Sequence, residues 1–275
     1  MNGRVTITRS AGIAEVRLSR ADKLNAIDGP MFDALEQAAH SLATMPDLRA
    51  IVISGEGRAF CAGLDLQNFS TMAGNHALPW RDLAERTHGE ANQAQHVVLA
   101  WREIPVPVIA AIHGLAFGGG FQLALGADIR IAAPDTRLSI MEIKWGLIPD
   151  MGGIALMRRL ARADVIRELT FSGREFSGTE AQAFGLVTRL APQPREAAIS
   201  LAEQIAVQSP DAIRAAKRLL RLSDHAGEAE VLLAESIEQQ HLIGSANQTE
   251  AIHANLEGRA PRFVDNIEDS HGMMK

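Results

Sequence analysis

The sequence predicts an α/β protein with a layered core and a helical last third. Apolar runs of strand length, such as 50–54 and 106–112, alternate with stretches of helical spacing through the first two thirds. Two such strands are followed by glycine-rich turns, and from about residue 154 onward helical patterns dominate. Because strands that alternate with helices form a sheet covered by helices, the helical last third must pack on that core or on a neighbouring subunit.

The N-terminal elements are expected to be a hairpin and a helix. Residues 4–9 and 13–18 both alternate apolar with polar side chains, and Gly12 lies between them. This pattern predicts a hairpin at the edge of a sheet. A helix is expected to follow, with Asp28 as its N-cap and Pro30 in its first turn.

The rest of the chain is interpreted from the same signals. The expected elements up to residue 133 are a strand and glycine turn (55–69), a flap (70–95), a helix (91–101), a strand (106–112), a glycine turn (114–120), a buried helix from Phe121 and a further apolar element (129–133). The helices expected after that point are 154–160, 163–170, 179–184, 195–208, 211–222 and 228–256.

Composition favours a cytoplasmic enzyme. The 275 residues are 47% hydrophobic and carry a net charge of −6 with acids and bases interspersed, which disfavours binding to nucleic acid. The single cysteine, Cys61, excludes a disulfide framework and fits a reducing compartment. The N-terminus lacks the apolar core of a signal peptide, and no stretch approaches the roughly 18 apolar residues of a membrane span.

Several common catalytic motifs are missing. The central turn reads G-x-x-x-G-G-G over 114–120, which is not the dinucleotide fingerprint G-x-G-x-x-G. The chain also lacks a G-x-x-x-x-G-K-[ST] phosphate loop, a G-x-S-x-G nucleophile elbow and an H-E-x-x-H metal motif. Cofactor-dependent redox, serine-hydrolase and zinc chemistry are therefore disfavoured, and a purely structural glycine cluster stays open.

Two glycine turns after two strands predict an oxyanion hole. The turns at 62–64 and 118–120 are each placed to direct backbone N–H groups at one shared oxygen. Two such donors polarise a carbonyl and stabilise the anion formed from it, and losing one typically costs about 10²–10³ in rate. The helix N-terminus that follows the second turn adds a favourable dipole.

Glu142 and Asp150 are the candidate proton carriers beside these donors. Glu142 lies in an apolar run, and burial there should raise its pKa toward neutrality. The alternatives are a solvated Glu142 on a helix face paired with Lys144 or Arg137, and Asp150 as the N-cap of the next helix. His113 and Cys61 are interpreted as structural residues, one hydrogen-bonded and the other small and buried.

At these residues the sequence resembles the crotonase superfamily, the enoyl-CoA hydratase/isomerase family. The resemblance runs through collinear blocks over nearly the whole chain. These blocks are LNAID (24–28), AFCAGLDL (59–66), IAAIHGLAFGGGFQLALGADIRIAA (109–133), MEIKWGLIPDMGG (141–153), FSG (171–173), AQAFGLVT, SPDAIRAAKRLL and GRAPRF (258–263).

The resemblance implies a spiral of ββα units over residues 1–200 and a helical oligomerisation region over 201–275, as in a homotrimer or a dimer of trimers. It also implies an acyl-CoA substrate, with CoA as part of the substrate and no metal or redox cofactor. The thioester oxygen would lie between the N–H groups of Leu64 and Gly119. The residues that match the family's CoA-binding positions are Lys23, Leu24, Ala26 and Ala62.

One departure from the family pattern bears on the reaction. Hydratases of the family use two glutamates to hold and split a water; the second matches Glu142, but the first falls on Gln122. A glutamine orients water but exchanges no proton at neutral pH. Isomerases of the family work with one carboxylate at the Glu142 position, and dienoyl isomerases add a second that matches Asp150. The naphthoate synthase branch needs a tyrosine, and this chain has none.

We therefore expect an enoyl-CoA hydratase/isomerase in which Glu142 moves protons to and from an enolate, with isomerisation favoured over hydration. Gln122 and Asp150 would position water or substrate, Asp150 also being a candidate second acid. The alternative is a non-catalytic acyl-CoA-binding or scaffold protein of the same fold. An RNA-binding role is disfavoured by the acidic net charge.

Overall fold

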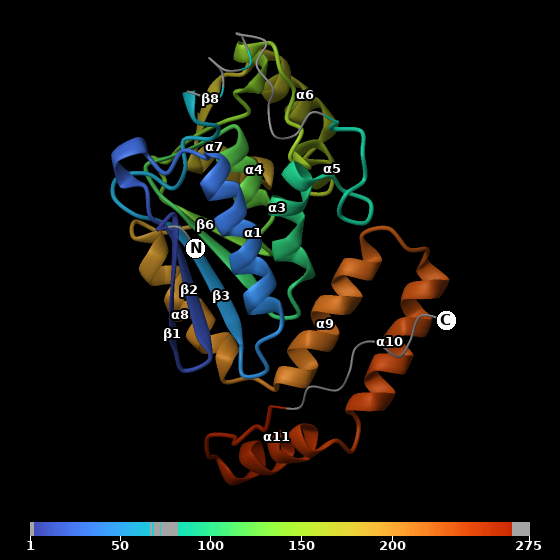
Figure 1. Cartoon of the computed structure of the whole chain (residues 1–275). Helices are drawn as coiled ribbons and strands as arrows, with labels where there is room; N and C mark the ends of the chain where they lie inside the picture. The colour runs from blue at the N-terminus through green and yellow to red at the C-terminus, as the bar shows by residue number, and fades with distance from the viewer. Residues whose placement is uncertain (1–2, 67, 69–71, 73–81, 266–275) are drawn as a thin grey trace.

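The computed structural model describes residues 3–66, 68, 72 and 82–265 and is built around a six-stranded sheet (Figure 1). The strand order is β1-β2-β3-β4-β6-β9, with the first pair antiparallel and every later pair parallel. The strands are β1 (Val5–Ser10), β2 (Ile13–Leu18), β3 (Ala50–Gly55), β4 (Val108–Ile112), β6 (Ile129–Ala132) and β9 (Arg189–Leu190).

The structure also contains a smaller, three-stranded sheet. Its order is β5-β7-β8, and its strands are β5 (Leu115–Phe117), β7 (Arg137–Ser139) and β8 (Glu175–Ser177). The sequence did not predict β5, β7, β8 or β9. Strands of two or three residues are too short for a period of two to be recognised, and β5 lies inside the expected glycine turn.

Helices follow most strands and make up the C-terminal part. They are α1 (Gly29–Ala43), α3 (Gln93–Glu103), α4 (Gly119–Leu125), α5 (Gly153–Met157), α6 (Ala163–Ser172), α7 (Gly178–Phe184), α8 (Pro194–Ala206), α9 (Pro210–Ser223), α10 (Glu228–Leu242) and α11 (Ala246–Glu257). Short 3₁₀ helices are η1 (Ala21–Lys23) and η2 (Glu142–Trp145).

The expected N-terminal hairpin and helix are confirmed. Ala11 and Gly12 both have positive φ, 50° and 77°, as the two-residue turns that suit twisted hairpins require. The side chain of Asp28 accepts a hydrogen bond from the Met31 N–H at 2.9 Å and so caps α1, which has Pro30 in its first turn.

Helices cover both faces of the large sheet. In Figure 1, α1 and α3 lie over one face, and α8 lies behind the other. The side chains of β3 divide between the two layers, since Ile51 and Ile53 belong to the core under α1 and α3, whereas Val52 packs with Ala198 and Ala202 of α8. Every residue of β3 and β4 is buried, as strands covered on both faces should be.

The prediction of a strand within 55–69 is wrong. Only isolated bridges form there among the described residues, from Cys61 to Ala116 and from Leu64 to Ile27. The segment forms one isolated bridge with each of two different neighbours, so it does not become a strand of either sheet. Of the flap expected over 70–95, most residues up to 81 lie outside the described part of the chain.

The last third is helical, but the single helix expected over 228–256 is two helices. Gly244 adopts φ 79°, and the Ser245 side chain accepts from the Gln248 N–H at 3.2 Å, which begins α11 anew. Helix α8 spans residue 200 and packs on the sheet. By contrast, α10 has no buried residue and stands away from the sheet (Figure 1).

No helix in the described residues is long and apolar enough to cross a membrane.

Candidate active site

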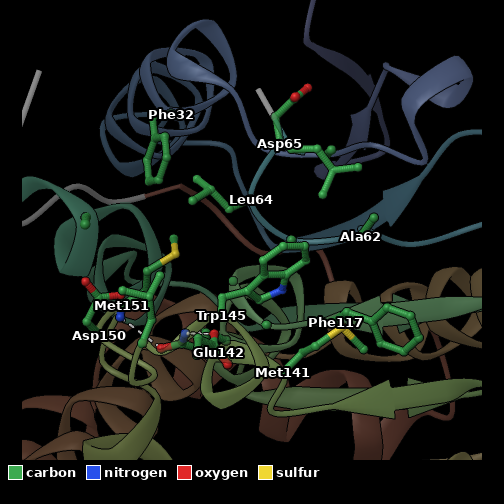
Figure 2. A pocket seen from close by; sticks show the side chains of 18 of the residues that line it. Phe32, Ala62, Leu64, Asp65, Phe117, Met141, Glu142, Trp145, Asp150 and Met151 are labelled. Atoms are coloured by element: carbon green, nitrogen blue, oxygen red, sulfur yellow. Dashed lines mark hydrogen bonds between the residues drawn. The ribbon is translucent and has the colours of Figure 1, made fainter. Parts of the chain in front are cut away.

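A cavity of about 1330 Å³ lies where the ends of β3 and β4 meet the smaller sheet. This is the carboxyl edge of parallel strands, where open α/β sheets bind ligands. Figure 2 shows Leu64, Trp145, Glu142 and Asp150 among the side chains around it. All nine sequence-predicted site residues line this cavity: Lys23, Leu24, Ala26, Ala62, Leu64, Gly119, Gln122, Glu142 and Asp150.

The two glycine turns lie side by side. The Cys61 N–H donates to the Leu115 carbonyl at 3.2 Å, and the Phe117 N–H donates back to the Cys61 carbonyl at 3.1 Å. Glycine makes this approach possible, because a Cβ on Gly120 would lie 2.4 Å from the Cys61 carbonyl oxygen. A Cβ on Gly63 would likewise lie 2.5 Å from the Phe117 carbonyl oxygen.

The backbone N–H groups of Leu64 and Gly119 remain available at this junction. Neither donates a hydrogen bond to any residue the structure describes. Gly119 is the first residue of α4, so its N–H is one of the donors that a helix leaves unpaired. Gly118 before it adopts φ 48°, ψ −122°, and its own N–H is occupied by the Ser139 carbonyl at 3.0 Å.

Gln122 is fixed on three sides. Its side-chain oxygen accepts from the backbone N–H groups of Met151 and Gly153, both at 2.9 Å, and its amide nitrogen donates to Glu142 Oε1 at 2.6 Å. The residue is only 2% exposed. Two donors on the oxygen leave the amide one orientation, with the NH₂ group toward Glu142.

Glu142 is a partly buried carboxylate with one oxygen occupied. Burial raises its pKa, backbone and Gln122 hydrogen bonds oppose that shift, and the charge of Asp150 adds to it. Oε2 is buried and has no hydrogen-bond partner among the described residues. The alternative in which Glu142 pairs with Arg137 is wrong, because Arg137 forms its ion pair with Glu175 instead.

Asp150 lies on the cavity wall and does not cap a helix. The N-cap of α5 is Gly152, without a side-chain hydrogen bond. Burial raises the pKa of Asp150, and its charge reaches Glu142. The site therefore holds two carboxyl groups with raised pKa values next to two free N–H donors, which is a combination typical of proton-transfer sites.

The loop that carries Lys23, Leu24 and Ala26 is held by a buried asparagine. The Asn25 side chain donates to the carbonyls of Glu56, Ala59 and Phe60 at 2.9–3.2 Å and accepts from the Arg20 N–H at 2.9 Å. Leu24 and Asn25 both adopt positive φ. In addition, the Ala62 N–H donates to the Leu24 carbonyl at 2.9 Å, so the loop lies along the first glycine turn.

The residues interpreted as structural are placed as follows. Cys61 is buried, and burial raises its pKa to about 12, so it stays a thiol. His113 hydrogen-bonds the Gly57 carbonyl at 3.0 Å. Asp128 accepts from the Val108 N–H at 2.7 Å and also pairs with Lys217. Asp65 forms an ion pair with Arg20.

Sequence reasoning missed several cavity residues. Phe32 on α1 and Met151 before α5 supply apolar wall, as does Trp145 on η2 (Figure 2). Arg58 and Asp22 also line the cavity. Phe32 has the helical spacing of a core residue, and only the tertiary structure shows that one side of it faces a cavity. Arg58, within a loop, gave no periodic signal at all.

The chain was compared with known families and structures. The sequence profile of the enoyl-CoA hydratase/isomerase family matches residues 8–266. The mitochondrial methylglutaconyl-CoA hydratase of Mus musculus is 31% identical over 259 residues, covering 92% of this chain and 79% of that protein. The carnitinyl-CoA dehydratase of Salmonella typhi is 34% identical over 224 residues, covering 80% and 81%.

Solved structures of enoyl-CoA hydratases have the same fold as this chain. The crystal structure of an enoyl-CoA hydratase from Bacillus anthracis superposes with a TM-score of 0.86 at 27% identity, over 96% of this chain and all of the other. That of an enoyl-CoA hydratase from Mycobacterium smegmatis gives 0.82 at 28% identity, over 94% and 98%. The crotonase fold expected from the sequence is confirmed, and the chain belongs to the enoyl-CoA hydratase/isomerase family.

Proposed function

We propose that this chain is an enoyl-CoA isomerase, which binds an unsaturated acyl-CoA and shifts its double bond. The observation that carries the proposal is the hydrogen bond from Gln122 Nε2 to Glu142 Oε1 at 2.6 Å. It leaves Glu142 as the titratable partner of that pair, because an amide exchanges no proton at neutral pH. A 1,3-proton shift needs one base that removes a proton and returns it, whereas hydration needs an acid as well.

The proposed reaction begins at the two backbone donors. The thioester oxygen of a β,γ-unsaturated acyl-CoA accepts from the N–H groups of Leu64 and Gly119, which lowers the cost of forming an enolate. The Glu142 carboxylate removes a proton from the α carbon, and the electron pair delocalises onto the thioester oxygen. Glu142 then returns the proton to the γ carbon, which yields the α,β-unsaturated ester.

The environment of Glu142 suits this cycle. Oε1 is occupied by the Gln122 amide, so Oε2, which has no partner among the described residues, is the oxygen left to carry the proton. Burial raises the pKa of the carboxyl group toward the working pH, where a base both accepts and releases a proton readily. Asp150 holds the substrate or a water at the cavity wall.

The CoA part of the substrate is proposed to lie along the loop of Lys23, Leu24 and Ala26 and against Ala62. All four residues line the cavity. Lys23 offers a cation to a phosphate, and the short side chains of Ala26 and Ala62 leave room for a chain to pass. Nothing in this scheme requires a metal or redox cofactor.

Hydration is the second candidate, and the names of the relatives favour it, since those compared above are a hydratase, a dehydratase and structures of enoyl-CoA hydratases. In this case the second N–H of the Gln122 amide would hold the attacking water. The proton for the α carbon would then have to come from Glu142 or Asp150.

One experiment separates the two candidates. The protein is incubated with crotonyl-CoA and with a β,γ-unsaturated acyl-CoA in deuterated water, and the products are analysed by mass spectrometry. Double-bond migration with deuterium on carbon and no gain of water supports isomerisation. Addition of water to crotonyl-CoA supports hydration. Binding of both esters without turnover would contradict both and favour a non-catalytic acyl-CoA-binding protein.

We also propose that the chain works as a homotrimer or a dimer of trimers assembled through its C-terminal helices. Helix α10 exposes Leu232, Leu233 and Ile237, at 54%, 62% and 41%, which is costly for a free surface. Light scattering should give a multiple of the monomer mass for the wild type. The Leu233→Glu variant should dissociate, whereas Glu235→Gln on the same helix should not.

A further inference from the structure

A cluster of one glutamate and two histidines, all partly buried, lies where α1 packs on α3. Glu36 comes from α1, His96 from α3, and His88 from the segment between residues 82 and 92. Helices α1 and α3 pack against each other over the sheet (Figure 1), which brings two of the three residues together on rigid elements. The third joins them from a loop.

The three side chains converge on one point. One carboxylate oxygen and one nitrogen from each imidazole lie within 4.8 Å of one another. His88 Nε2 is 2.9 Å from Glu36 Oε1, and the two imidazole rings stack with centroids 4.5 Å apart. Ligands of a tetrahedral zinc ion lie about 3.3 Å apart, given bonds of roughly 2.0–2.1 Å. Rotations of the partly exposed side chains close the remaining gap.

Two of these side chains already have a hydrogen-bond partner of the kind that orients a metal ligand. His88 Nδ1 lies 2.8 Å from the Thr87 hydroxyl, and Gln93 Nε2 donates to Glu36 Oε2 at 3.2 Å. With a metal on Nε2 of His88, its Nδ1–H donates to Thr87, which fixes the ring. The Gln93 amide fixes the carboxylate in the same way.

The His96 ring stacks on the ring of His88, and the nitrogens of the His96 ring make no hydrogen bond to any described residue. Only the backbone N–H of His96 is used, by the Asn92 carbonyl. Both nitrogens of this imidazole are therefore free to bind a ligand beside a second imidazole and a carboxylate.

We propose that Glu36, His88 and His96 form a zinc site of the His₂-carboxylate type, with water as the fourth ligand. Two neutral imidazoles and a carboxylate are ligands that zinc accepts in tetrahedral sites. The ion replaces the hydrogen bond between Glu36 and His88 and cross-links α1 to the stretch that carries His88 and His96.

The site also bears on the cavity. The Asn92 side chain donates to the Leu83 carbonyl at 2.9 Å, and both residues line the cavity. His88 lies between them in sequence and exchanges two backbone hydrogen bonds with Ala91. Zinc on His88 therefore holds this stretch against α1 and α3 and orders one wall of the cavity.

Zinc binding can be tested without any acyl-CoA, so its failure is distinct from failure of the proposed isomerase. The chain is prepared without a histidine tag, treated with EDTA and titrated with Zn²⁺ by calorimetry. We expect one ion per chain with a micromolar Kd. The Glu36→Gln and His96→Gln variants should each raise the Kd at least about tenfold. Thr87→Val should raise the Kd about tenfold, because it removes the hydroxyl that hydrogen-bonds His88 Nδ1.

The matched control is His225→Gln, which makes the same change at an exposed residue between α9 and α10 and should leave the Kd unchanged. Circular dichroism of His96→Gln without zinc should match the wild type, which excludes misfolding. Limited proteolysis should show that Zn²⁺ protects residues 82–92 in the wild type only. Absence of stoichiometric binding, or an unchanged Kd in both Glu36→Gln and His96→Gln, would overturn the proposal.

Discussion

Replacing Gln122 by glutamate should convert the proposed isomerase toward a hydratase. The new carboxylate keeps one oxygen on the N–H groups of Met151 and Gly153, where the amide oxygen lies now. Its second oxygen takes the place of Nε2, 2.6 Å from Glu142 Oε1. The change alters one terminal atom and leaves the scaffold hydrogen bonds in place.

The expected effect follows from the charge at that distance. Two ionised oxygens 2.6 Å apart repel by about 6 kcal/mol at an effective dielectric constant near 20. The pair therefore retains one proton over a wide pH range, and one pKa of the pair rises strongly. One carboxyl group can then protonate the α carbon while the other takes a proton from water, so the pair ends with the protons it began with.

The assay compares two rates on one preparation. Loss of enoyl-thioester absorbance with crotonyl-CoA measures hydration, and double-bond migration from the β,γ-unsaturated ester measures isomerisation. We expect Gln122→Glu to raise the ratio of hydration to isomerisation about 10²-fold, the lower end of what a general acid contributes. Hydration by the variant should show a bell-shaped pH profile, because it needs the singly protonated pair.

A matched control is Gln182→Glu, which makes the same charge change on exposed α7, outside the cavity. Its ratio should equal that of the wild type. If Gln122→Glu folds and binds CoA esters like the wild type but leaves the ratio unchanged, the argument that the amide at residue 122 selects the reaction is wrong.

The remaining predictions concern Glu142, Gly120 and Asn25. Wild-type isomerisation should rise with pH to a plateau, since the base must be ionised, and Glu142→Gln should lower kcat by at least about 10². Because burial in the folded state raises the pKa of Glu142, the wild-type free energy of unfolding should fall as the pH increases from the ordinary glutamate range through the folded pKa. Urea titrations of Glu142→Gln should show a smaller slope, because the raised pKa of Asp150 still contributes. Gly120→Ala places a Cβ 2.4 Å from the Cys61 carbonyl oxygen, so it should lower the free energy of unfolding by about 1–3 kcal/mol and reduce turnover, whereas Gly29→Ala, with open space around its Cβ, should change neither. Asn25→Ala leaves three backbone carbonyls without their donor and should lower the urea midpoint by the equivalent of at least about 2 kcal/mol; an unchanged midpoint would mean that water replaces the amide.

Much of the fold could be predicted because its strands and helices are long enough to be periodic. The buried runs at β3 and β4, the Asp28 cap and the hairpin at Gly12 are local signals that the tertiary structure does not override. Short strands such as β9 were not predicted, because two residues are too few to show the alternation of a strand. The break at Gly244 was missed because one glycine is tolerated inside a helical pattern.

The candidate site was predicted as a set of residues but not as a set of contacts. Leu64, Gly119 and Glu142 were found through the glycine turns and through resemblance, and they do line one cavity. The orientation of Gln122 depends on two N–H groups some thirty residues away, at Met151 and Gly153, which no local pattern reveals. For the same reason no local pattern predicts that Glu36 and the two histidines meet.

The site forms where the two sheets join, and this explains why its chemistry can change without its scaffold. The glycine turn after β4 contains β5, and the Gly118 N–H donates to the Ser139 carbonyl of β7, so the Gly119 donor and the Glu142 segment both adjoin one small sheet. None of these contacts involves the terminal nitrogen of Gln122. Glutamine and glutamate both offer an oxygen to the same two N–H groups, and they differ only in whether the other terminal atom donates to Glu142 or competes with it for a proton. Residue 122 can therefore set the proton count of the site while the fold, the donors and the cavity stay as they are.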